Sequence, residues 1–159
     1  MTQPVLTRAP ATELFENIRQ FLHDGCFASF TVTGNSMWPL LRHGKDHVVL
    51  EPCVEKPLKK GDVVLFMPEQ GRYLLHRIDW VRERQFRTAG DGNCFRDGIF
   101  NQDCVVGRVV TVVRKGKEIS CANWLYRLCS RIWMALYWAR PVLLKVLRKL
   151  ANWKHKKKQ

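Results

Sequence analysis

The chain has 159 residues, of which 46% are hydrophobic and 26% are charged, a composition typical of a globular domain. The net charge is +13, and residues 117–159 carry 11 Lys and Arg against one acid, so the rest is nearly balanced. No apolar run approaches the ~18 residues of a spanning helix, and the N-terminus lacks the apolar run of a signal peptide. The six cysteines show no C-x-x-C spacing, so we expect free thiols, no metal and no cofactor.

Three segments follow one another along the sequence: 1–26, 27–116 and 117–159. In the first, apolar residues recur on one face of residues 12–23, which predicts a helix that caps the domain. In the second, short runs rich in Val, Phe, Leu and Ile are separated by Gly, Pro, Asn and Asp clusters, which predicts strands. These runs are 27–32, 47–51, 62–67, 72–81, 85–88 and 104–114. No long helical pattern separates them, so we predict a mainly β fold with a curved, antiparallel sheet.

Four residues of the second segment could carry chemistry. Ser36 follows a Gly-Asn pair just after the first run, where the chain must turn. His76 lies within an apolar run, and Asp91 and Asp97 lie in a loop that contains glycines. Taken singly, these residues are explained as a turn serine, a core histidine and solvated acids. Together they are the side-chain types of serine hydrolysis, in which histidine takes the serine proton and a carboxylate orients the imidazole.

The third segment is predicted to form amphipathic helices. Apolar residues recur on one stripe of residues 124–139, Arg127 and Arg131 lie off that stripe, and Pro141 is expected to break the helix. An apolar face, a basic face and several tryptophans over residues 124–153 are typical of a helix that lies in a membrane interface. A helix packed on the protein, with a basic tail for solubility, is the alternative. Nucleic-acid binding is not favoured, because the positive charge is concentrated near the C-terminus and no known nucleic-acid-binding motif accompanies it.

Five short boxes in the second segment suggest a family. In order they read GNSMWPLL, GDVVLF, LLHRI, FRTAGDGNCFRD and VVGRVV, and they resemble the conserved boxes of the type I signal peptidases. This resemblance implies Ser36 as the nucleophile and His76 as the base, where the usual bacterial enzymes carry lysine. The chain therefore resembles the Ser/His branch of the family, which is the endoplasmic-reticulum and archaeal type. In that branch Asp97 would be the third catalytic member and Asp91 a supporting aspartate.

The resemblance implies a serine endopeptidase whose β domain sits against the membrane. Such enzymes cleave signal or leader peptides after small side chains, from a substrate held extended beside a strand. A catalytically inactive peptide-binding module of the same fold is the alternative, and a self-cleaving regulator is disfavoured by the histidine base. Members usually carry an N-terminal membrane helix, which this sequence does not show, so we expect the C-terminal helices to replace the anchor. The lysines near the C-terminus favour the cytoplasmic face.

Overall fold

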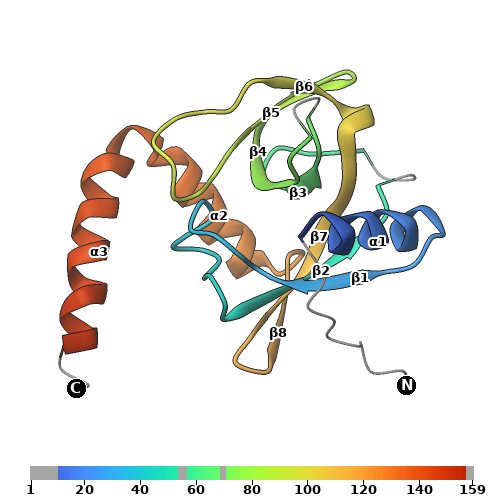
Figure 1. The fold of residues 1–159 in the computed structure, drawn as a ribbon. Helices are drawn as coiled ribbons and strands as arrows, with labels where there is room; N and C mark the ends of the chain where they lie inside the picture. The colour runs from blue at the N-terminus through green and yellow to red at the C-terminus, as the bar shows by residue number, and fades with distance from the viewer. Residues whose placement is uncertain (1–10, 54–56, 69–70, 157–159) are drawn as a thin grey trace.

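The computed structural model describes residues 11–53, 57–68 and 71–156. Over these residues the chain forms one antiparallel sheet with a helix before it and helices after it (Figure 1). The prediction of a mainly β, antiparallel fold with an N-terminal helix and C-terminal helices is therefore confirmed.

The elements have the following bounds. The helices are α1 (Ala11–His23), α2 (Trp124–Ala135) and α3 (Arg140–Lys156), with the 3-10 turns η1 (Gln102–Cys104) and η2 (Tyr137–Ala139). The strands are β1 (Ala28–Thr31), β2 (Asp46–Glu51), β3 (Val63–Phe66), β4 (Leu74–Arg82), β5 (Gln85–Ala89), β6 (Ile99–Asn101), β7 (Val105–Arg114) and β8 (Lys117–Ser120). Their order across the sheet is β1-β2-β7-β3-β4-β5-β6, and β8 also pairs with β7. The predicted helix and the six predicted strands all occur, with ends that differ by at most two residues.

Two short strands, β6 and β8, were not predicted. Each depends on a neighbour, since β6 pairs with β5 and β8 pairs with β7, and neither has an apolar run of its own. Because β7 and β8 form a hairpin, the sheet continues past residue 116, where we expected the β domain to end. The helical part of the third segment begins only at Trp124.

Strand β3 lies between two hydrophobic cores. All four of its residues are buried, and successive side chains of a strand point to opposite faces. Val63 and Leu65 join a core that includes Ile18 of α1, whereas Val64 and Phe66 join a second core with the aromatic rings of β5 and β6. A run of four buried apolar residues is thus explained by burial on both sides of the sheet.

The C-terminal helices differ from the prediction in one detail. The break lies at Leu136 and η2, not at Pro141, which falls in the first turn of α3. Proline is tolerated there because the first N–H groups of a helix have no intrahelical partner. Helix α3 runs along the side of the molecule away from α1 (Figure 1). Among the described residues, no helix combines the length and the apolar character needed to cross a membrane.

Asp46 anchors the long turn between β1 and β2. Its buried carboxylate accepts hydrogen bonds from the Arg42 backbone N–H at 2.9 Å and from the Arg114 Nη2 group at 2.7 Å. Burial alone would raise the pKa of Asp46, but hydrogen bonds from Arg114 and Arg42 lower it from 3.8 to about 2. The charged form of this carboxylate therefore stabilises the fold.

We expect Asp46→Asn to lower the free energy of unfolding by about 2 kcal/mol at pH 7. A carboxyl whose pKa is lowered in the folded state stabilises fully above its unfolded pKa, here 3.8, and loses that effect as pH falls towards about 2. Urea unfolding at several pH values should show the difference from wild type shrinking over this interval. Asp103→Asn, which removes an exposed partner of Arg84, is the control. If the destabilisation by Asp46→Asn did not change with pH, the stabilising role of the charged Asp46 carboxylate would be contradicted.

Candidate active site

Ser36 lies in a tight turn after β1 and is half-buried. The turn begins at Gly34, whose φ of 83° lies in the left-handed region that favours glycine. The Gly34 N–H donates to His43 Nδ1 at 2.9 Å, and the Trp38 N–H donates to the Asn35 carbonyl at 3.1 Å. Within the described part of the chain, the Ser36 backbone N–H donates to no protein group, so it can donate to a ligand.

His76 and Asp97 form a hydrogen-bonded pair. His76 lies in β4 opposite Val64, is 5% exposed, and its Nδ1 is 2.6 Å from Asp97 Oδ2. The same oxygen accepts a hydrogen bond from Thr88 Oγ1 at 2.6 Å, and the Asp97 N–H donates to the Thr88 carbonyl at 2.8 Å. Thr88 therefore fixes both the backbone and the carboxylate of Asp97. A ring that donates from Nδ1 keeps Nε2 as a proton acceptor.

Ser36 and His76 line the same cavity, which has a volume of about 210 Å³. Its walls are largely apolar and come from α1, β1, the turn after β1, β3 and β4; they include Phe15, Phe30, Val32, Met37, Leu65 and Leu75. The described structure contains no hydrogen bond between the Ser36 hydroxyl and the His76 ring. In unliganded hydrolases this contact is often long and shortens when substrate binds.

Asp91 pairs with Arg77, and no hydrogen bond or ion pair joins it to His76 in the described part of the chain. Adjacent residues of a strand point to opposite faces, so His76 and Arg77 diverge from β4. Arg77 Nη2 lies 2.9 Å from Asp91 Oδ2, Arg77 Nε lies 3.0 Å from Asp91 Oδ1, and both side chains are at most 1% exposed. Burial alone would lower the pKa of Arg77, but the Asp91 carboxylate raises it, so Arg77 stays charged. Asp91 thus ties its loop to β4 through Arg77.

Two glycines allow the loop that carries Asp91 to touch the Ser36 turn. The Gly92 N–H donates to the Ser36 carbonyl at 2.7 Å. A Cβ at Gly90 would lie 2.5 Å from the Ser36 carbonyl oxygen, and a Cβ at Gly92 would lie 2.5 Å from that of Asn35. Real Cβ atoms essentially never approach backbone this closely, so the contact requires glycine at both positions.

The C-terminal helices hold the same loop from its other side. Trp133 Nε1 donates to the Asp91 carbonyl at 3.0 Å, and Arg140 Nη1 donates to the Gly90 carbonyl at 3.1 Å. Both side chains are at least nine-tenths buried. Sequence reasoning missed Thr88, Trp133 and Arg140 as parts of the site. A signal was present for the last two, because both lie off the apolar stripe that we assigned to the membrane.

Gly92→Ala should lower the free energy of unfolding by about 1–3 kcal/mol, because the new methyl group overpacks the Ser36 turn. Urea denaturation measures this change, and hydrogen exchange of the amides near Ser36 shows whether the loss is local. Gly98→Ala is the matched control in the same loop, since its Cβ would meet nothing nearer than Phe100 Cζ at 3.7 Å. Equal effects of the two substitutions would contradict the close approach of the loop and the turn.

The described residues contain no group of three His, Cys, Asp or Glu side chains that could hold a metal ion. Instead, the Ser36 and His76 side chains line one cavity, and the Asp97 carboxylate is hydrogen-bonded to His76 Nδ1. In comparisons with known proteins, no family model matches this chain and no curated protein matches it.

Proposed function

We propose that this protein is a serine endopeptidase resembling the type I signal peptidases. It would cleave signal or leader peptides after small residues, at a membrane surface. The observation that carries the proposal is the buried His76–Asp97 hydrogen bond beside a cavity that Ser36 also lines. The ordered sequence boxes that resemble the signal peptidases contain the same three residues.

The proposed mechanism assigns one role to each of the three side chains. Ser36 Oγ attacks the peptide carbonyl, and His76 Nε2 accepts the hydroxyl proton and then returns it to the leaving amine. Asp97 holds the ring by Nδ1 and stabilises its charged form. The unoccupied Ser36 N–H donates to the oxyanion, a contribution whose loss typically costs about 10²–10³ in rate. Water then hydrolyses the acyl-enzyme, with His76 acting again as base.

Two open strand edges support an extended peptide as substrate. Strand β1 ends the sheet and pairs only with β2 among the described strands. The first residues of β4 pair with β3 on one edge, but β5 begins to pair only at Arg77, so no described strand pairs with their other edge. The cavity has residues of both strands in its walls. A peptide could pair with these edges and place a small apolar side chain in the cavity.

Single substitutions test the chemistry on a leader-type peptide with a small residue before the scissile bond. Ser36→Ala, His76→Ala and Asp97→Asn should each lower kcat/KM on the order of 10³-fold or more. Product formation followed by mass spectrometry measures this loss and locates the cleaved bond. Asp103→Asn, an exposed acid outside the cavity, should retain full activity. Activity retained by both Ser36→Ala and His76→Ala would remove the proposal.

The second candidate is an inactive peptide-binding module. It is favoured by one observation, namely that no hydrogen bond joins Ser36 to His76 in the described structure. It predicts that the same peptide binds equally to wild type and to Ser36→Ala, as measured by fluorescence anisotropy, and that neither protein turns it over. Turnover by wild type alone would exclude this candidate.

The exposed face of the C-terminal helices supports association with a membrane surface. The stripe assigned from the sequence is solvent-exposed on α2, where Trp124 is 72% exposed, and α2 packs on the protein through Trp133 on its other face. Trp138 and Trp153 are 81% and 56% exposed. Soluble proteins rarely leave such apolar surface uncovered. We propose that this face lies in the interface, with the active site on the cytoplasmic side.

Full-length protein should float with phosphatidylcholine vesicles that contain phosphatidylglycerol, because basic residues of the tail add about 1 kcal/mol each at an anionic surface. The double variant Trp138→Ala/Trp153→Ala should partition roughly tenfold less, since it loses apolar area. Phe21→Ala removes an aromatic ring of similar exposure from α1 and is the control. Unchanged flotation of the double variant, or an equal loss for Phe21→Ala, would contradict the proposed surface.

A further inference from the structure

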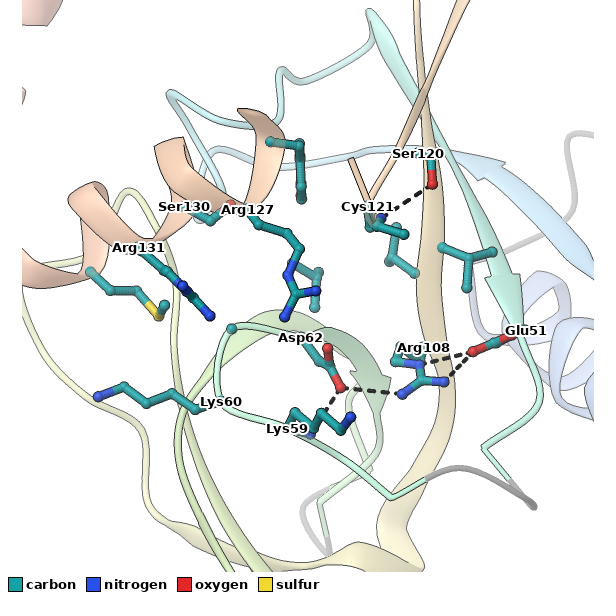
Figure 2. A pocket seen from close by; sticks show the side chains of 17 residues that line it. Glu51, Lys59, Lys60, Asp62, Arg108, Ser120, Cys121, Arg127, Ser130 and Arg131 are labelled. Carbon is teal, nitrogen blue, oxygen red and sulfur yellow. Dashed lines mark hydrogen bonds and ion pairs between the residues drawn. The ribbon is translucent and has the colours of Figure 1, made fainter. Parts of the chain in front are cut away.

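A second cavity, of about 320 Å³, lies between α2 and the sheet (Figure 2). It shares no lining residue with the cavity of Ser36 and His76. Arg127 and Arg131 point from α2 towards the turn before β3, which carries Lys59 and Lys60 (Figure 2). The walls therefore bring together cations that are far apart in the sequence.

The positive charge of this cavity is not neutralised from within. Its two acids, Glu51 and Asp62, are both bonded to Arg108: Nε lies 3.0 Å from Glu51 Oε1, and Nη1 lies 3.3 Å from Asp62 Oδ2. The four remaining cations of the lining, namely Lys59, Lys60, Arg127 and Arg131, form no ion pair within the described part of the chain. All four of these side chains are solvent-exposed, so water and salt screen their mutual repulsion, and the cavity keeps an excess of positive charge that an anion could neutralise.

Ser130 is a second and independent sign of a ligand. It lines the cavity from α2, between the two arginines, and is only 4% exposed. Its hydroxyl has no hydrogen-bond partner. Buried hydroxyl groups are nearly always hydrogen-bonded, and leaving one unpaired costs free energy. The Ser130 oxygen is closed to solvent in this structure, so the side chain would have to rotate to donate to an acceptor held by the neighbouring arginines.

We propose that this cavity binds a phosphate group. Phosphate has several acceptor oxygens and two negative charges, and guanidinium groups bind it with paired hydrogen bonds. A shallow hollow lined by Trp124 and Leu128 adjoins the cavity and shares Arg127 and Arg131 with it. The apolar hollow could hold an acyl chain, so the phosphate can belong either to a lipid headgroup or to a soluble phosphate compound. The inference does not rest on peptidase activity.

Inorganic phosphate is the first probe, titrated calorimetrically into the full-length chain with ionic strength held constant by sodium chloride. Arg127→Gln and Arg131→Gln should each weaken binding roughly tenfold, and Ser130→Ala should weaken it without a change in charge. Arg148→Gln is the matched control, because it removes one exposed cation of the same tail outside the cavity. Urea unfolding of every variant separates lost binding from lost folding.

Vesicles identify the source of the phosphate. Phosphatidylcholine vesicles with and without phosphatidic acid are floated with wild type, Arg127→Gln/Arg131→Gln and Arg148→Gln. Binding to phosphatidic acid that requires the two arginines supports a lipid headgroup. Binding of inorganic phosphate that requires them, without such vesicle binding, supports a soluble phosphate compound.

The proposal is overturned if neither probe binds, or if Arg148→Gln reduces binding as much as the arginine pair does. Binding of single-stranded RNA that depends on the two arginines, with no binding of either phosphate probe, would also overturn it. Ser36→Ala is titrated in parallel and should bind phosphate as wild type does. Failure of the peptidase proposal would therefore leave this result unchanged, and the two can be judged separately.

Discussion

The buried ion pair of Arg77 and Asp91 is the interaction on which the candidate site depends. It joins β4 to the loop after β5, and Arg77 Nη1 also donates to the Gly61 carbonyl at 2.9 Å, before β3. Three separate segments thus meet at one guanidinium group. Losing one partner of such a pair leaves a buried charge without compensation, which typically costs about 3–5 kcal/mol. The position of the loop is therefore fixed by electrostatics as well as by packing.

The loop in turn relates the candidate nucleophile to the candidate base. Its glycines press against the Ser36 turn, and its far end carries Asp97 to the His76 ring. Because His76 and Arg77 point to opposite faces of β4, two acids of a single loop can serve both residues. One acid orients the imidazole, and the other, Asp91, holds the loop in place.

Periodicity predicted the strands that have their own apolar pattern, and it failed for β6 and β8, which exist through pairing with longer neighbours. The sequence and the resemblance were sufficient to select Ser36, His76 and Asp97 as candidates. The distances between their side chains could not be predicted, because they depend on how the loop after β5 crosses the sheet. The position of Trp133 off the apolar stripe sets it apart from the exposed residues, but its hydrogen-bond partner could not be predicted, because that partner is a backbone carbonyl 42 positions away.

The donors that Trp133 and Arg140 supply to the loop have a consequence for regulation. Displacing either helix would strip the Gly90 and Asp91 carbonyls of their partners, so the tail is not an independent appendage of the β domain. If binding to a bilayer moves α2, the hydrogen bond from Trp133 couples that movement to the loop beside Ser36. In that case, membrane binding would change the affinity for the proposed peptide substrate. By thermodynamic linkage, bound peptide would change the affinity for the membrane by the same factor.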